Sequence, residues 1–257
     1  MDKEICIIAG VNKDGEYESF GQIHLKVGET ISVMGSTGSG KTALITDIEL
    51  LSQGDSVTKR KILLDGKIPS DDIRYNPTYK PIAMISQNTK CFSDLFVTEF
   101  LEIHARARGI SVHSVADETL NLANQFTGEA IKGANRVTEL SGGQTRSLLI
   151  ADAITIGAAP IILLDEIENA GINKNEIMKI VKSVNKLIIF VTHDPVVALQ
   201  TEKRIVMKNG SIDKIISRTP IEEKIMEDIV KIDKNMVKLR NSLRAGEDCD
   251  YWFSDIG

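Results

Sequence analysis

The fold of this chain is decided by one stretch, Gly35-Ser36-Thr37-Gly38-Ser39-Gly40-Lys41-Thr42, which matches the phosphate-binding pattern G-x-x-x-x-G-K-S/T. An apolar run, Ile31 to Met34, comes directly before it, and a run with helical spacing, Ala43 to Leu51, comes directly after it. A strand before such a loop and a helix after it are the context that makes the match specific. The sequence therefore predicts an α/β fold in which a triphosphate binds at the start of a helix.

The residue types of this loop explain why it would hold a nucleotide. Glycines allow the backbone to wrap around a triphosphate with its N–H groups pointing inward, and the start of the helix adds a favourable partial charge. Lys41 is expected to reach the outer phosphates, and Thr42 offers a hydroxyl to Mg²⁺. The predicted ligands are ATP and Mg²⁺. The alternative, a glycine-rich turn without a ligand, is disfavoured by the strand and the helix on either side.

The rest of the core is predicted to consist of further strands. Short apolar runs recur between turn residues, and several are continuously apolar and β-branched, as in strands buried on both faces, whereas others are typical of hairpins. This pattern predicts a mixed sheet with an antiparallel flank. The runs are Ile5 to Ala9, Ile23 to Val27, Ile31 to Met34, Lys61 to Leu64, Ile82 to Ile85, Ile161 to Leu164, Leu187 to Thr192 and Arg204 to Met207.

Two other parts of the chain have a different pattern. Between Thr98 and Leu140 the strands give way to helical spacing, which predicts a helical subdomain inserted at about residues 88–158. Beyond Ser217, apolar residues recur every three or four positions, and an acidic, aromatic tail begins at Gly246. We expect a core domain over 1–218, followed over 219–257 by an amphipathic helix and the tail. That helix buries its apolar stripe either on its own core or on another protein.

Composition and charge exclude several classes. A chain of 257 residues, 42% hydrophobic and 26% charged, is enough for one large domain with an insertion, and a net charge of −5 gives no global reason to bind nucleic acid. The scattered cysteines have no metal-ligand spacing, which favours a reducing, cytoplasmic compartment, and the acidic start is unlike a signal peptide. The longest apolar stretch, Leu148 to Leu164, is interrupted by Asp152 and Pro160, so it predicts a helix end and a strand rather than a membrane span.

Two carboxylates end one of the predicted strands, in Ile161-Ile162-Leu163-Leu164-Asp165-Glu166. Ligands bind at the carboxyl ends of parallel strands, so Asp165 is placed to hold Mg²⁺, directly or through water. Glu166 is placed to accept a proton from an attacking water. Taken alone, the motif is equally typical of a strand that runs into an acidic turn.

A third motif, Leu140-Ser141-Gly142-Gly143-Gln144, precedes a helical run, Thr145 to Ile156. A serine and two glycines at the start of a helix make a second place where backbone N–H groups can meet an anion. The alternative is a two-glycine turn capped by Ser141. The complete phosphate loop upstream favours the anion site.

In this order and spacing, the three motifs resemble those of the nucleotide-binding domains of ATP-binding-cassette (ABC) ATPases, over about Glu4 to Arg218. Two further landmarks fall where that family has its Q-loop and its switch histidine: Gln87 in ISQNTKCFSDLFVTEFL and His193 in IIFVTHD. The resemblance implies a P-loop NTPase core of ABC type and ATP hydrolase activity.

The resemblance also implies how these residues act. Two such domains close head to tail, and each ATP lies between the phosphate loop of one subunit and the signature motif of the other. In that arrangement Gln87 contacts Mg²⁺ and the attacking water, and His193 contacts the γ-phosphate. The signature residues assigned to the nucleotide are Ser141, Gly142, Gly143 and Gln144. The second ABC subunit is either a copy of this chain or a different one.

The chain departs from the family pattern at Asp152, where a basic residue is common, and at two places that concern the ATP sites. Ile172 replaces the aspartate that helps to couple the two ATP sites in most members, which puts tight coupling in doubt. Asn12 and Lys13 occupy the neighbourhood of the adenine-stacking aromatic residue. Tyr17 or Phe20 is the alternative stacking residue, and without one we expect loose base specificity.

Two function classes stay open on the sequence. In the first, the chain is the ATPase subunit of a transporter, and the apolar region around Gln87 to Leu101 docks a helix of a separate permease, unless that region packs on the helical insertion. In the second, it is a soluble ATPase that remodels a metalloenzyme or a cofactor-assembly client. The chain is then cytoplasmic, or peripheral on the inner face of a membrane through its partner. The DNA-repair cassettes, which carry long insertions, and the small-molecule kinases, which lack the Ser-Gly-Gly motif, are disfavoured.

Overall fold

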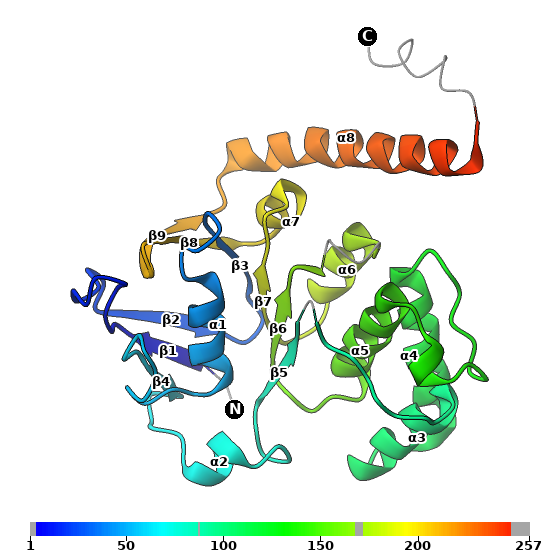
Figure 1. Ribbon diagram of the computed structural model, residues 1–257, viewed down its shortest axis with the longest axis horizontal. Coiled ribbons are helices and arrows are strands. Elements are labelled where there is room, and N and C mark those ends of the chain that lie inside the picture. The colour runs from blue at the N-terminus through cyan, green and yellow to red at the C-terminus, as the bar shows by residue number, and fades with distance from the viewer. Residues whose placement is uncertain (1–3, 87, 168–171, 248–257) are drawn as a thin grey trace.

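The computed structural model describes residues 4–86, 88–167 and 172–247, and two sheets form its centre (Figure 1). In the smaller sheet, β1 (Glu4–Ile8) lies between β2 (Gln22–Lys26) and β4 (Lys61–Leu64), and both pairings are antiparallel. In β2 the buried side chains alternate with exposed ones, as expected for a strand with one face on the core. The predicted antiparallel flank is confirmed.

The larger sheet has the strand order β5-β6-β7-β3-β8-β9. Its strands are β3 (Thr30–Met34), β5 (Ile82–Ile85), β6 (Ile161–Asp165), β7 (Leu187–Val191), β8 (Lys203–Lys208) and β9 (Ser211–Ser217). All neighbouring strands run parallel except β8 and β9, which form a hairpin. Strand β9 was not predicted, because SIDKIIS contains neither a continuous apolar run nor a regular alternation.

The parallel strands bury both of their faces, and each face has its own apolar cluster. On β6, Ile161 and Leu163 belong to a cluster with the small sheet and α1 (Lys41–Glu49), whereas Ile162 and Leu164 belong to a cluster with the helices on the other side. Successive side chains of a strand point to opposite faces, so a continuously apolar strand is one that is covered on both.

The helical subdomain contains α3 (Val97–Ala107), α4 (Val112–Phe126) and α5 (Gly142–Thr155), with a short 3₁₀ turn at Val137–Glu139 before α5. Helix α3 buries Val97, Leu101 and Ala105, which are four residues apart and therefore lie on one face. The stretch from 148 to 164 separates into the end of α5 and strand β6, as predicted. The structure also contains α2 (Asp71–Tyr75), α6 (Lys174–Val181) and α7 (Pro195–Gln200).

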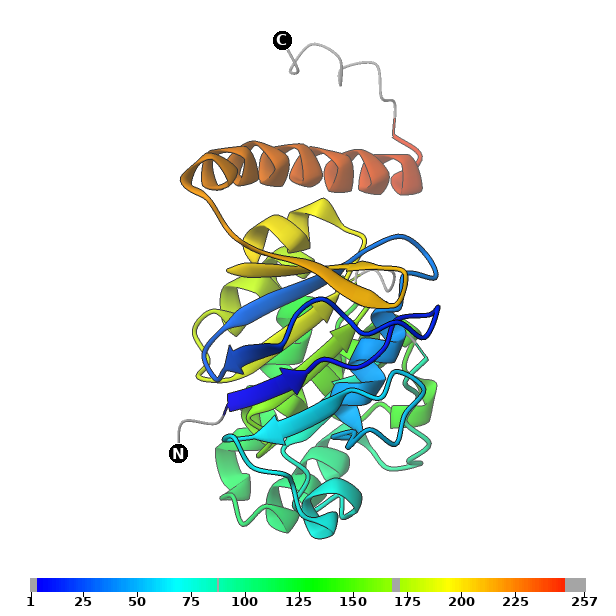
Figure 2. The ribbon, with the colours of Figure 1, turned by 90° about the vertical axis from the view of Figure 1, so that its left-hand side faces the viewer.

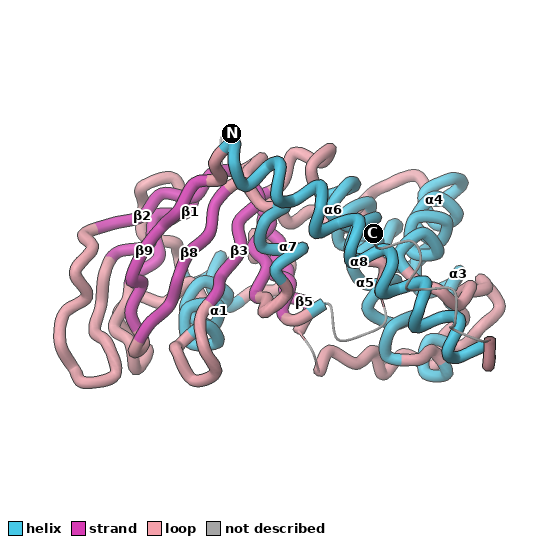
Figure 3. Tube along the Cα trace, turned by 90° about the horizontal axis from the view of Figure 1, so that it is seen from above, coloured by secondary structure: helices cyan, strands magenta, loops and turns pink. Residues whose placement is uncertain are grey.

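The last described helix, α8 (Pro220–Ala245), lies above the sheets and crosses over α7 (Figure 2). Seen from above, it runs from the side of α7 across α6 and towards the helical subdomain (Figure 3). Thr219 caps its N-terminus by accepting a hydrogen bond from the Glu222 amide, and Gly246, at φ 72°, ends it. Among the described residues, no helix is both long enough and apolar enough to cross a membrane.

Candidate nucleotide site

The phosphate loop connects the end of β3 to the start of α1, as predicted, and its glycines are required by close contacts. Gly35 has φ 150°, and a Cβ added there would lie 2.4 Å from the Ser39 Oγ and 2.5 Å from the Met207 carbonyl oxygen. Gly40 has φ 105°, and a Cβ there would lie 2.8 Å from the Gly210 Cα. Glycine, which has no Cβ, tolerates both the positive φ and the close neighbouring atoms. The loop is therefore seated tightly on the β8–β9 turn.

Lys41 lies at the first turn of α1 and is 7% exposed. Its Nζ donates hydrogen bonds to the carbonyl oxygens of Gly35, at 2.8 Å, and Ser36, at 3.1 Å, so the side chain folds back over the loop. Burial lowers the pKa of Lys41 below its ordinary value, while the carboxylates of Glu166 and Asp165 act in the opposite direction. The carboxylates of Glu166 and Asp165 therefore act on the charge of Lys41.

The sheet order explains why these residues meet. Strand β7 lies beside β3, and β6 lies beside β7. Both pairings are parallel, so the carboxyl ends of β6 and β7 lie at the same edge of the sheet as the phosphate loop. Asp165 ends β6, and the amide of Glu166 donates to the Val191 carbonyl oxygen at 2.9 Å, which joins the two strand ends. The His193 Nε2 lies 3.8 Å from the Glu166 Oε1. The structure thus brings together the loop, both carboxylates and the histidine.

Glu166 has an unusual backbone, with φ 48° in the left-handed region. A residue with a Cβ is strained in that region by about 1–2 kcal/mol. Such strain persists where neighbouring structure imposes it, and it concentrates at functional sites. Here the residue in this conformation is Glu166, which directly follows β6 at the edge of the sheet and has a partly exposed side chain.

The residues expected to hold Mg²⁺ fit that ion by their chemistry. Thr42 supplies a hydroxyl on α1 and Asp165 a carboxylate at the end of β6, and hard oxygen ligands of this kind are those that Mg²⁺ prefers. In the loop, the Ser39 Oγ is buried and has no hydrogen-bond partner among the residues that the structure describes. A buried hydroxyl without a partner is unfavourable, so a phosphate oxygen or a water is the expected partner of Ser39.

The third predicted motif starts α5. Ser141 is the N-cap, its Oγ accepts a hydrogen bond from the Gln144 amide at 3.3 Å, and the Gln144 side chain accepts one from the Ser141 amide at 2.9 Å. This reciprocal pair is a capping box, which was the alternative interpretation of the serine. Ser141 and Gly142 are nevertheless exposed. The cap therefore fixes the helix start and leaves its surface accessible.

Sequence reasoning missed three hydrogen bonds that connect the phosphate loop, Lys13 and the β8–β9 turn. The Lys13 Nζ donates to the Gly38 carbonyl oxygen, and the Lys13 amide donates to the Asn209 carbonyl oxygen at 3.1 Å. On the same turn, the Gly210 amide donates to the Ser39 carbonyl oxygen at 2.8 Å. A lysine in a loop carries no pattern that would have identified this role.

Behind that turn lies a buried ionic cluster centred on Arg60, whose side chain is 0% exposed. Its Nε and Nη2 donate to the two carboxylate oxygens of Glu18, at 2.9 and 2.5 Å, and its Nη1 donates to Asp47 at 3.1 Å. Its Nη2 also donates to the Gly210 carbonyl oxygen. The cluster therefore joins the residue before β4, the β1–β2 loop, α1 and the β8–β9 turn.

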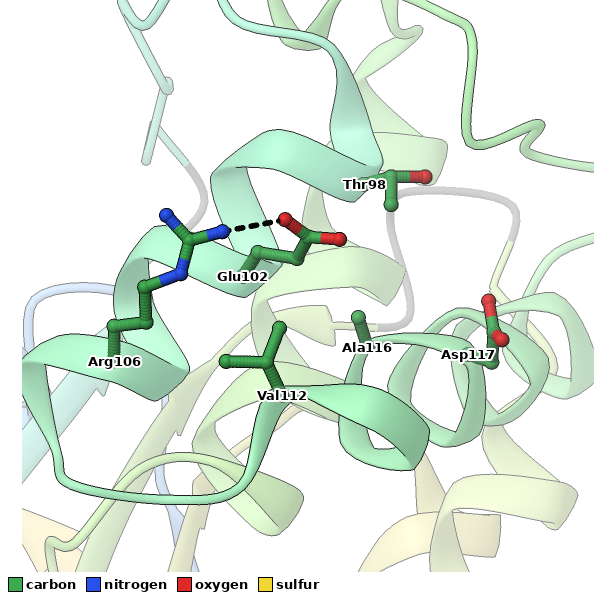
Figure 4. Close-up of a pocket in the computed structure, with 6 residues that line it drawn as sticks. All are labelled: Thr98, Glu102, Arg106, Val112, Ala116 and Asp117. Atoms are coloured by element: carbon green, nitrogen blue, oxygen red, sulfur yellow. Dashed lines mark hydrogen bonds and ion pairs between the residues drawn. The ribbon is translucent and has the colours of Figure 1, made fainter.

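A surface hollow of about 400 Å³ lies between α3 and α4, away from the predicted site residues (Figure 4). Glu102 and Arg106 form an ion pair at its rim, with an Nη2–Oε2 distance of 2.8 Å. Its other lining residues are Thr98, Val112, Ala116 and Asp117. The hollow belongs to the surface of the helical subdomain rather than to the nucleotide site.

With this geometry established, comparison with known proteins decides the family. A family profile described as ABC transporter matches residues 21–169. The chain belongs to the ABC transporter family. It is 46% identical over 245 residues to an uncharacterized ABC transporter ATP-binding protein of Methanocaldococcus jannaschii, a match that covers 95% of this chain and 94% of that protein.

More distant ABC proteins are also similar. The chain is 29% identical to the macrolide export ATP-binding/permease protein MacB of Campylobacter jejuni, over 93% of this chain but 37% of that protein. A dimeric ATP-binding cassette, solved in a post-hydrolysis state with ADP and Pi, matches with a TM-score of 0.62 at 25% identity, over 84% of this chain and 99% of that one. The predicted fold, an ABC-type core with an inserted helical subdomain, is confirmed, and the chain is an ABC-type ATPase.

Some predicted features of this ABC ATPase lie outside the described residues or differ in setting. Gln87 lies outside them, so its role stays a prediction. Ile172 is 8% exposed and belongs to the apolar cluster of the helical side, pairing with Thr127 in a short bridge. Tyr17 is 89% exposed, whereas Phe20 packs against the other apolar cluster.

Proposed function

We propose that this ABC ATPase is the ATP-binding subunit of a membrane transporter and that it closes head to tail with a second ABC subunit around Mg-ATP. The observation that carries the proposal concerns two helix starts that are suited to bind an anion. One is the phosphate loop before α1, and the other is the Ser141 motif before α5, in a different part of the structure. Lys13 and Gly210 hold the phosphate loop, whereas the side chain of Ser141 bonds to the amide of Gln144 at the start of α5, in the helical subdomain. An exposed second anion site at the start of α5 is explained if it faces the phosphate loop of another subunit.

Within one subunit, the residues at the sheet edge divide the chemistry. Lys41 supplies positive charge to the β- and γ-phosphates, and the backbone amides of the loop bind their oxygens. Glu166, at the end of β6, accepts the proton of the attacking water, and His193, 3.8 Å away, contacts the γ-phosphate and keeps that carboxylate in place. Thr42 and Asp165 would hold Mg²⁺, which neutralises charge that develops on the phosphate oxygens.

The choice of a transporter rests on two kinds of support. The relatives with assigned roles carry transporter names, including methionine import and macrolide export. In this chain, Phe92 is 86% exposed and Phe96 40% exposed, between β5 and α3, whereas Cys91 packs against the helical cluster. Exposed aromatic side chains in a loop favour a docking surface for a membrane partner. A soluble client receives no comparable support.

The test is recovery of the tagged protein from membranes with its co-purifying chains. We expect a membrane protein to co-purify with the wild type and to be lost with Phe92→Asp. The control is Val57→Asp, because Val57 is 90% exposed on the loop between α1 and β4 and belongs to neither the nucleotide site nor the proposed docking surface. Recovery of both forms in the soluble fraction with a soluble client would contradict the transporter assignment.

A further inference from the structure

Helix α8 is held on the core by charged side chains. Among the described residues, neither of the two apolar clusters contains a residue of α8. Its ion pairs with the rest of the chain are Arg204–Glu222, Arg218–Glu223 and Lys174–Asp233. None of the described side chains of α8 is fully buried, so the helix can change its position without opening either apolar cluster.

Asp233, near the middle of α8, connects the helix to the catalytic edge through Lys174. The Nζ of Lys174, at the start of α6, lies 2.7 Å from the Asp233 Oδ1 and 2.5 Å from the Asp194 Oδ2. The three side chains are 15–16% exposed. Burial lowers the pKa of Lys174, but its hydrogen bonds to Asp194 and Asp233 outweigh burial and raise that pKa above its ordinary value. Lys174 therefore keeps its positive charge in the ordinary pH range.

Asp194 in turn fixes the backbone next to His193. Its Oδ1 accepts hydrogen bonds from the amides of Val196, at 2.7 Å, and Val197, at 3.3 Å, and so caps α7. Its own amide donates to the Thr192 Oγ1 at 2.9 Å. One carboxylate thus caps α7 with one oxygen and binds Lys174 with the other, which connects Lys174 to the turn that carries His193.

We propose that Asp233 of α8, through Lys174 and Asp194, is a positioning residue for His193, and that the contact of α8 with Lys174 through Asp233 sets the rate of ATP hydrolysis. The inference rests on the proposed function in one respect, since it takes His193 as the residue that contacts the γ-phosphate. Displacement of a catalytic group by as little as 1 Å lowers rates by up to about a hundredfold. Through the contacts of Asp233, Lys174 and Asp194, the position of α8 affects the nucleotide site.

The test is steady-state hydrolysis of Mg-ATP by full-length Asp233→Asn. We expect kcat to fall about tenfold and KM for ATP to change by less than about twofold, because the phosphate loop is not altered. Asp233→Glu, which retains the charge, is expected to recover most of the rate. Glu223→Gln is the matched control, because it removes another ion pair of α8, with Arg218 at 3.3 Å, that does not lead to Asp194.

A second readout separates positioning from a general loss of structure. Hydrogen exchange at the amides of Val196 and Val197 should accelerate in Asp233→Asn, while that of β3 and β7 stays unchanged. In a His193→Ala background, Asp233→Asn should lower kcat no further, because both changes act on one group. If the two losses multiply, if Asp233→Asn keeps kcat within twofold, or if Glu223→Gln lowers kcat equally, the inference is wrong. If His193→Ala alone hydrolyses ATP normally, the proposed role of His193 fails instead.

Discussion

Arg60→Met tests whether the buried ionic cluster is essential to the fold around the phosphate loop. The substitution keeps a side chain of similar length but removes the guanidinium, and it leaves Glu18 and Asp47, with exposures of 0% and 2%, buried without their cation. Removal of one partner from a buried ion pair destabilises a protein by about 3–5 kcal/mol. Because a domain is stable by only about 5–15 kcal/mol, we expect a large shift of the urea midpoint.

The measurement is equilibrium unfolding in urea followed by far-ultraviolet circular dichroism. The matched control is Arg106→Met, which breaks the exposed Arg106–Glu102 pair on α3, where the side chains are 62% and 33% exposed. An exposed pair one helical turn apart contributes about 0.3–0.5 kcal/mol, so this variant should unfold like the wild type. If Arg60→Met unfolds within about 1 kcal/mol of Arg106→Met, the cluster is not a buried charge network of the kind described.

Three further predictions concern the nucleotide and the chain end. Lys41→Ala should remove Mg-ATP binding in calorimetry without unfolding the protein, and normal affinity would contradict the assignment of the phosphate loop. Glu166→Gln should bind ATP but hydrolyse it slowly enough for light scattering to detect a closed dimer with saturating Mg-ATP; a monomer would mean that Glu166 is not the base or that closure needs a different partner. Deletion of residues 246–257 should leave ATP binding unchanged and weaken association with a partner or second subunit, whereas intact assembly with lost ATP binding would assign the tail to the catalytic core.

The parts of the fold that the sequence predicted are those in which neighbouring residues carry the information. Continuous apolar runs identified the parallel strands, and the glycines of the loop after β3 identified the phosphate site. Strand β9 was not predicted because its place is set by pairing with β8 rather than by its own pattern. The amphipathic segment that begins after Ser217 was apparent as helical spacing, but the sequence alone does not show that α8 is anchored through Asp233.

The candidate site was also predicted from the sequence only in part. The residues of each motif were found because their spacing is local, and the sheet order brings the loop, the carboxylates and His193 to one edge. Lys13 and Arg60 were missed because their partners lie far along the chain, Asn209 and Gly210 among them. Long-range pairs of ordinary charged residues leave no periodicity to detect. Gln87 lies outside the described residues and stays a prediction.

The position of β3 between β7 and β8 has a consequence for how the protein is made. A ribosome synthesises the phosphate loop early, yet both neighbours of β3 in the sheet come from residues 187–208, and the turn that seats the loop ends at Gly210. Pairing of strands so distant in the chain is slow, because a long loop must close before any contact forms. A nascent chain that ends before Gly210 therefore contains the phosphate loop but has not completed the nucleotide site. Until β7 and β8 have been synthesised, both edges of β3 are unpaired and must be kept from pairing with other chains.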